Sequence, residues 1–189
     1  MQIAAGRFRG LKLLSPPDGL SRPTLSRIRQ ALFNLLAPVP AHGAFLDLYA
    51  GAGSVGLEAY SQGSARVVLV ESDPAVGRVL RQNLLRLDPE EQYLELLPRD
   101  AHHAVRDLLG QNRKFDVIFL DPPYGPGSIA AWSRAGTLDR LLTPQGFLIL
   151  QHSRRDSVPE SWAGCRRVKE RVYGDTSLSF FQISEKETL

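Results

Sequence analysis

The residues best suited to chemistry are Asp121, Pro122, Pro123 and Tyr124, which follow the apolar run Phe115–Leu120. An acidic residue at the carboxyl end of a buried strand lies where open α/β sheets bind ligands. An ionised carboxylate only accepts hydrogen bonds, and the prolines stiffen the loop without adding competing N–H donors. The tyrosine ring can stack on a flat base. We therefore expect this loop to hold a planar group that carries an NH2.

A glycine-rich turn earlier in the chain predicts a nucleoside cofactor. Residues 47–56 contain Gly-x-Gly-x-x-Gly between an apolar run and a helical stretch. Glycines there let the backbone approach a ligand at a helix N-terminus, and Glu71, at the end of the next apolar run, could grip ribose hydroxyls. Both a nicotinamide dinucleotide and S-adenosylmethionine fit this pattern. Asp47, which could orient a cationic amino-acid end, and the Asp-Pro-Pro-Tyr loop, which no dehydrogenase needs, favour S-adenosylmethionine.

Around these turns, short apolar runs alternate with helical stretches. The predicted strands are 44–48, 66–71, 93–97, 115–120 and 146–151, and the predicted helices are 55–62, 74–87 with Asp73 as its cap, 101–109 and roughly 129–142. Such alternation is typical of an α/β fold with a mostly parallel sheet and helices on both faces. Residues 166–173 and 178–183 predict an antiparallel hairpin that completes a seven-stranded sheet. We expect a single domain, 1–189, with an N-terminal extension, 1–40, and a core, 41–189.

The N-terminal extension carries the basic excess of the chain. The net charge is +5 over residues 1–30 and −2 over the remainder, as expected of a segment that binds phosphates or of a solvated basic terminus. Strands at 2–5 and 11–14 would present Arg7, Phe8 and Arg9 at a hairpin tip, which could grip a nucleic acid or fold back on the protein. A helix from Thr24 to the prolines near residue 38 would carry Arg27 and Arg29 off its apolar stripe.

Composition limits the remaining possibilities. Cys165 is the sole cysteine, so an intrachain disulfide and a multi-cysteine metal site are excluded, and we expect no metal. The chain has no apolar run of membrane-spanning length and no signal-peptide pattern at its N-terminus. The expectation is a cytoplasmic protein that does not bind membranes, with a monomer as the simplest state.

The motifs in combination resemble a known group of enzymes. Asp47–Gly56, Glu71, Asp100 and Asp121–Tyr124 are similar, in order, to the motifs of class I S-adenosylmethionine-dependent methyltransferases that modify exocyclic amino groups of bases. The resemblance narrows to the RsmD family, which methylates guanine N2 in small-subunit ribosomal RNA. The segments that narrow it are 1–10, 22–24, 29–34 and 173–176. It implies a Rossmann-like fold and extends from end to end.

The resemblance also implies a role for each matching residue. The cofactor would be bound by Asp47, Gly51, Gly53, Glu71, Asp100 and Ala101. Within that set, Glu71 would accept from the ribose hydroxyls and Asp100 from the adenine amino group. Asp121 and the carbonyl of Pro122 would hold the guanine N2 amino group, with Tyr124 stacked on the base. The expected RNA-binding residues are Arg7, Arg9, Arg22, Arg27 and Arg29.

Other functions remain open on the sequence. The Asp-Pro-Pro-Tyr loop can recognise an amino group, but it does not specify which base carries that group. An enzyme that methylates adenine in DNA or RNA is therefore an alternative. A noncatalytic RNA-binding or ribosome assembly factor could keep the same fold, although the intact Asp121 and cofactor motif argue against it. The expected partner is small-subunit ribosomal RNA in a partly or fully assembled subunit.

Overall fold

The structure is a computed structural model that describes residues 1–16, 26–36, 43–123, 127–135 and 137–184. Its strands form one eight-stranded sheet in the order β3-β2-β1-β4-β5-β8-β7-β6, with the first five parallel and the rest antiparallel. The strands are β1 Ala44–Asp47, β2 Arg66–Val70, β3 Leu94–Leu97, β4 Phe115–Leu120, β5 Leu142–Ser153, β6 Ser161–Trp162, β7 Cys165–Tyr173 and β8 Thr176–Ile183. This is the α/β architecture that the alternation of apolar runs predicts.

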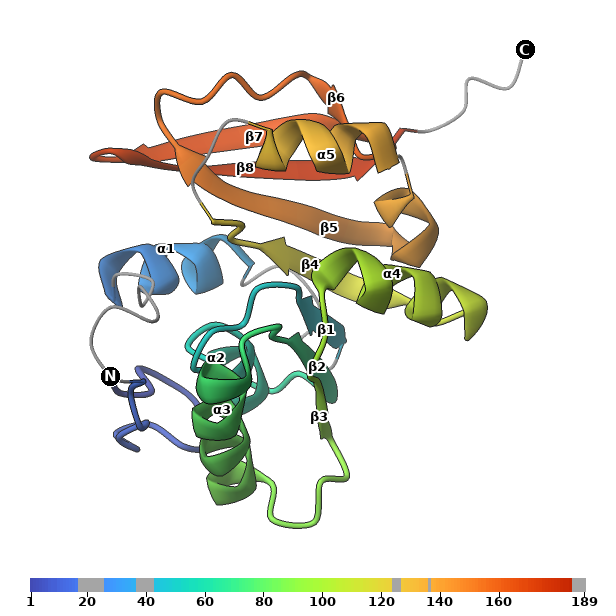
Figure 1. Ribbon diagram of the computed structural model, residues 1–189. Coiled ribbons are helices and arrows are strands. Elements are labelled where there is room, and N and C mark those ends of the chain that lie inside the picture. The colour runs from blue at the N-terminus through green and yellow to red at the C-terminus, as the bar shows by residue number, and fades with distance from the viewer. Residues whose placement is uncertain (17–25, 37–42, 124–126, 136, 185–189) are drawn as a thin grey trace.

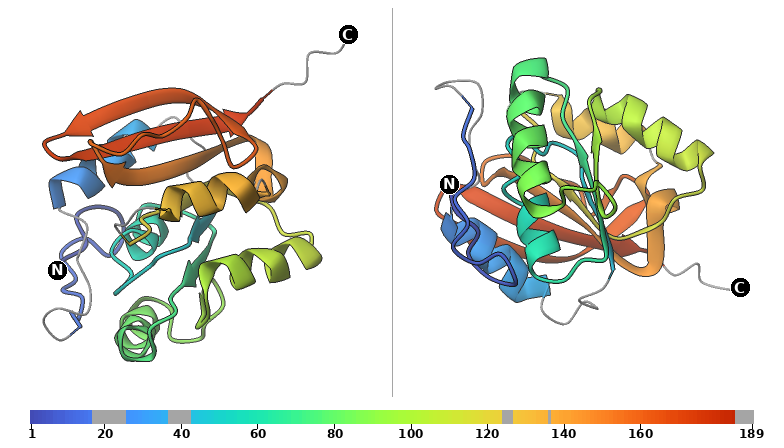
Figure 2. Two further views of the ribbon diagram at one scale, coloured as in Figure 1. Left: turned by 45° about the horizontal axis from the view of Figure 1, so that its top comes forward. Right: turned by 90° about the horizontal axis from the view of Figure 1, so that it is seen from below.

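Helices cover both faces of the sheet and enclose two hydrophobic cores (Figures 1 and 2). The helices are α1 Ser26–Leu36, α2 Gly56–Ser61, α3 Pro74–Leu87, α4 Ala101–Gly110, α5 Ser128–Ala135 and the short 3-10 helix η1 Leu138–Leu141. Apolar side chains of α1, α2 and α3 pack in one core, and those of α4, α5 and η1 pack in the other. Among the described residues, no helix has the length and apolar character needed to cross a membrane.

Three details of the sheet and its helices differ from the sequence prediction. The sheet has eight strands instead of seven because the two-residue β6 pairs with the start of β7. Strand β5 begins at Leu142, four residues earlier than expected, and a register shift relative to β4 accommodates the added length. The single helix expected at 129–142 is instead α5 followed by η1, and Gly136 in the intervening sequence disfavours a continuous helix.

The N-terminal segment forms an irregular hairpin in place of the two regular strands that its glycines suggest. Its two arms pair through the Gln2–Lys12 bridge and through the amides of Ile3 and Leu13, which donate to the carbonyls of Leu11 and Met1 at 3.0 and 2.9 Å. The backbone of the segment also bonds to α2. Glu58, which is fully buried in α2, accepts from the amides of Ala4 and Ala5 at 2.8 and 2.9 Å. Gly6 has φ +80, and a Cβ there would lie 1.9 Å from the carbonyl oxygen of Ser61. Close backbone contact with α2 therefore requires glycine at this position.

Candidate active site

Four neighbouring strands bring four polar side chains to one edge of the sheet. Glu71, Asp47, Asp121 and Gln151 stand at the carboxyl ends of β2, β1, β4 and β5, which run parallel. The residues that immediately precede them pack in the core beneath α4 and α5. Because successive side chains of a strand point to opposite faces, all four face the side of the sheet that α1, α2 and α3 cover. This carboxyl edge is where α/β sheets bind ligands.

Asp47 is the most buried acid of this row, with 1% of its surface exposed. Its Oδ2 accepts from the amide of Gly56 at 2.9 Å, whereas Oδ1 has no hydrogen-bond partner in the described part of the chain. Burial is the main reason that the pKa of Asp47 is raised to about 7. The nearby carboxylates of Asp121 and Glu71 contribute to the rise, and the amides of Gly56 and Tyr49 oppose it. An unpaired buried acceptor among other acids is suited to a cationic group.

The glycine-rich loop is fixed from both sides. Glu71 accepts from the amide of Gly51 at 3.0 Å through Oε2 and from the amide of Asp73 at 2.8 Å through Oε1. Behind the loop, the buried Asn83 of α3 donates to the carbonyl of Ala52 at 3.0 Å. Gly53 adopts φ +90, a conformation that favours glycine. Each oxygen of Glu71 keeps a second lone pair, so the carboxylate can still accept from hydroxyl groups of a ligand.

Asp100 immediately precedes α4, and Ala101 is the first residue of that helix. The exposed Asp100 caps the helix, because its Oδ1 accepts from the amides of His102 and His103 at 2.9 and 3.2 Å, and Ala101 is buried beside it. The ring of His102 stacks on Trp132 with 3.9 Å between centroids. Trp132 in turn donates through Nε1 to the hydroxyl of Tyr49 at 2.9 Å. This contact chain joins the loop after β1 to helices α4 and α5.

Asp121 lies at the end of β4 and is half-buried. Its Oδ2 accepts from Nε2 of Gln151 at 2.8 Å, and Pro122 next to it is buried. Tyr124 lies outside the described residues, so its expected stacking role stays a prediction. The sequence prediction missed Gln151, although its position at the end of a predicted strand on the same edge is a signal that could have identified it.

The structure contradicts the expected RNA-binding role of Arg29. It is 2% exposed, its Nη2 donates to the carbonyl of Gln2 at 2.7 Å, and its Nε lies 3.3 Å from Oε2 of Glu58. Burial lowers the pKa of Arg29, and the charge of Glu58 opposes that shift. Arg29 therefore joins the N-terminal segment to α1 and α2 instead of contacting RNA. The sequence prediction treated it as a solvent-facing residue and overlooked Glu58 as its partner.

The other basic residues of the expected set divide between two edges of the sheet. The guanidinium of Arg7 lies 4.0 Å from the ring centroid of Tyr60, on which Phe8 also stacks at 5.8 Å. Tyr60 stacks in turn on Tyr93, which precedes β3, so Arg7 lies at the edge opposite the carboxyl ends. Phe8 thus folds back onto the protein, as one of the two interpretations of the hairpin tip expected. Arg9 is exposed nearby.

Arg27, in contrast, belongs to the carboxyl edge. It is exposed at the start of α1, and a Cβ added to Gly174 would lie 3.1 Å from its Nη2. Gly174 lies in the turn between β7 and β8, where Thr176 pairs with Ser153 at the end of β5. Arg27 is therefore the described member of the expected RNA-binding set on the same edge as Asp121, and Arg22 falls outside the described residues.

A family model described as Conserved hypothetical protein 95 matches residues 1–182. Ribosomal RNA small subunit methyltransferase D of Haemophilus influenzae is 31% identical over 186 residues, covering 96% of this chain and 93% of that protein. The chain belongs to the RsmD family. The RsmD protein of Escherichia coli K12 is 29% identical, covering 96% of this chain and 89% of that protein.

Solved structures agree with this membership. A hypothetical protein of Thermus thermophilus, TTHA0928, superposes with a TM-score of 0.82 at 32% identity, covering 97% of this chain and 99% of that one. The fold is that of the class I methyltransferases, as the resemblance implied. In this RsmD-family chain, the residues that the motifs single out at the ends of β1, β2 and β4 share one edge and one face of the sheet.

Proposed function

We propose that the protein transfers a methyl group from S-adenosylmethionine to the exocyclic N2 amino group of a guanine in small-subunit ribosomal RNA. The observation that carries the proposal is the position of Asp121, a strand-end carboxylate that accepts from Gln151. It lies near the buried carboxyl of Asp47, whose Oδ1 has no hydrogen-bond partner among the described residues. Membership of the RsmD family supports the substrate class, because the curated relatives are named for small-subunit ribosomal RNA methylation.

The residues at the carboxyl edge fit the cofactor. The buried Oδ1 of Asp47 suits a cationic amino group, and the lone pairs of Glu71 suit two ribose hydroxyls. Asp100 uses Oδ1 for the helix cap, so Oδ2 can accept from an adenine amino group. The bound cofactor supplies an electrophilic methyl group on a sulfonium. Glu71 and Asn83 keep the glycine loop in a shape that lets its backbone lie against the ligand.

Asp121 and the carbonyl oxygen of Pro122 activate the amine by position. The lone pair of an exocyclic amine is delocalised into the base, which makes the nitrogen a poor nucleophile. Two acceptors on its N–H bonds favour a pyramidal nitrogen and direct its lone pair away from the ring. The carboxylate of Asp121 takes up the proton that nitrogen loses when the C–N bond forms. Such positioning contributes up to about 7 to 11 kcal/mol in the best intramolecular cases.

The RNA approaches the same edge that carries Asp121. Arg27 lies on that edge and is exposed, so it can contact a phosphate near the target base. Arg9 is exposed at the opposite edge, where it could contact a more distant phosphate. Tyr124 would stack on the base. The substrate is ribosomal RNA within a partly or fully assembled small subunit, and the enzyme acts as a monomer.

Kinetics of Asp121→Asn test the proposal. An amide keeps the shape of the side chain but replaces one acceptor with a donor, so kcat should fall by about 100-fold or more while cofactor affinity stays within about two-fold. Asp156→Asn is the matched control. Asp156 is an exposed acid in the loop after β5, and its carboxylate accepts from the amide of Ser153. The assay follows tritiated methyl transfer to unmodified small-subunit particles and to protein-free ribosomal RNA. Unchanged kcat in Asp121→Asn would contradict the proposed role.

A further inference from the structure

We propose that Gln151 is a positioning residue of this site, whose amide orients the carboxylate of Asp121 and stabilises its charged form. The inference rests on the proposed function and adds a residue to it. The contact is direct: Nε2 of Gln151 donates to Oδ2 of Asp121 at 2.8 Å, and Gln151 is only 6% exposed. Solvent therefore competes little for this hydrogen bond.

The register of the sheet sets the geometry of the pair. Leu120 of β4 pairs with Leu150 of β5, so the next residues, Asp121 and Gln151, stand side by side. Both follow leucines of the core beneath α4 and α5, so both face the opposite side of the sheet. The donor and acceptor are thus aligned by two strand ends, which hold side chains more rigidly than a loop does.

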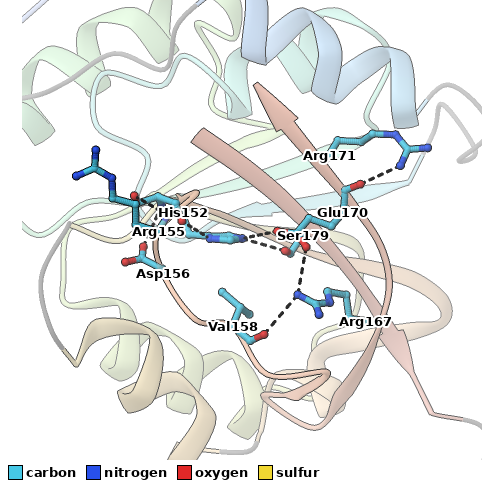
Figure 3. A network of polar contacts seen from close by, with 9 residues as sticks. His152, Arg155, Asp156, Val158, Arg167, Glu170, Arg171 and Ser179 are labelled. Atoms are coloured by element: carbon cyan, nitrogen blue, oxygen red, sulfur yellow. Dashed lines mark hydrogen bonds and ion pairs between the residues drawn. The ribbon is translucent and has the colours of Figure 1, made fainter. Parts of the chain in front are cut away.

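The end of β5 is anchored on its other face. His152, the residue after Gln151, is buried, and its Nε2 lies 2.9 Å from Oγ of Ser179 on β8 (Figure 3). Arg167 of β7 bonds to the carbonyl of Val158 at 3.4 Å and to Glu170 at 3.3 Å, which ties the loop after β5 to the hairpin. These contacts restrict the backbone from which Gln151 reaches Asp121.

The neighbouring charges explain why a neutral donor is useful here. Asp121 lies close enough to Asp47 for each carboxylate to oppose the ionisation of the other. A hydrogen bond donated to the charged form of Asp121 counteracts this repulsion. Glutamine donates without adding a charge to a row that already holds Glu71, Asp47 and Asp121.

The second end of the amide argues against a purely structural role. Oε1 of Gln151 is buried and has no hydrogen-bond partner within the described ranges. A buried acceptor without a partner destabilises the fold, so an apolar side chain of similar size should suit packing at least as well. The benefit of glutamine at this position is therefore its contact with Asp121.

Gln151→Met tests the inference, because methionine keeps the length of the side chain and removes the donor. The expected result is a fall in kcat of about 10- to 100-fold, with the cofactor Kd and the KM for RNA within about two-fold of wild type. The acid limb of the kcat profile should move to higher pH, because Asp121 loses a donor to its charged form. The Tm should change little, because removal of the buried, unpaired Oε1 offsets the loss of the hydrogen bond to Asp121.

Ser177→Ala is the matched control. Ser177 lies on β8 opposite His152, and its hydroxyl is likewise buried without a partner in the described segments, but it belongs to a strand that does not border Asp121. Its kcat and pH profile should equal those of wild type. If wild-type protein transfers the methyl group and Gln151→Met has the same kcat and pH profile, this inference is overturned and the proposed function is not. Wild-type protein that transfers no methyl group would overturn the proposed function and the inference with it.

Discussion

Cofactor affinity should depend on the protonation state of Asp47. Burial raises the pKa of this carboxyl to about 7, with Asp121 and Glu71 adding to the shift. If its unpaired Oδ1 receives the cationic amino group of the cofactor, only the ionised form binds well. Lowering the pH from 7.5 to 6 should therefore weaken binding of S-adenosylmethionine, whose amino group stays largely protonated over that range.

The size of the effect follows from the pKa. For a ligand that binds only the ionised form, the apparent Kd is multiplied by about 11 at pH 6 and by about 1.3 at pH 7.5, which is about an eight-fold difference. Binding at pH 7 should also release about half a proton per site, because about half of the free protein is protonated there.

Isothermal titration calorimetry measures both quantities, since buffers with different ionisation enthalpies reveal the released protons. Asp47→Asn is the control: it should bind more weakly than wild type at pH 7.5 and lose the pH dependence. A wild-type Kd that is flat between pH 6 and 7.5, or an equal slope in Asp47→Asn, would refute the assigned role of Asp47.

The same carboxyl affects folding in the absence of ligand. Because its folded pKa lies above the ordinary value of 3.8, the folded protein keeps this proton between about pH 4 and 7 while the unfolded chain has lost it. The contribution of Asp47 to the free energy of unfolding therefore falls as pH rises through that window. Asp47→Asn should remove this slope and be more stable than wild type at pH 8, which urea titrations at several pH values would measure.

Three further predictions concern the N-terminal region. Glu58→Gln should lower the free energy of unfolding by about 3 to 5 kcal/mol in urea titrations, because it leaves the charge of Arg29 buried without its partner; a loss below about 1 kcal/mol would refute this. Gly6→Ala should speed hydrogen exchange of residues 1–14, because its Cβ would collide with Ser61, and unchanged protection would contradict the packing. Arg27→Ala should weaken RNA binding and reduce its salt slope by about 0.7 to 0.9, with cofactor affinity as the control that must not change.

The fold was predictable because its elements depend on local patterns. Runs of apolar residues identified β1 to β4 within one or two residues, and Asp73 caps α3 as expected, accepting from the amides of Ala75 and Val76. The acidic residues at the ends of β1, β2 and β4 could also be predicted from the sequence, because the carboxyl ends of neighbouring parallel strands must share one edge of the sheet. Local sequence patterns therefore predicted the strands and helices of the core and the positions of Asp47, Glu71 and Asp121.

Contacts between distant segments were not predictable. The helical pattern of α1 places Arg29 off the main apolar stripe, but the side chain is buried because the N-terminal segment covers it and Glu58 pairs with it. The bond from Gln151 to Asp121 likewise depends on the β4–β5 register, which no local pattern specifies. The role of a buried charged or amide side chain depends on the group that it bonds to. When that group is distant in the sequence, only the folded structure identifies it.

The measurement that most directly tests the central claim is nucleoside analysis of the methylated product. Purified protein is incubated with tritiated S-adenosylmethionine and unmodified small-subunit particles, and the RNA is digested to nucleosides, with Asp121→Asn run in parallel. We expect label in N2-methylguanosine with wild type and little or none with the variant. Label in N6-methyladenosine, or no transfer by a protein that binds the cofactor, would contradict it.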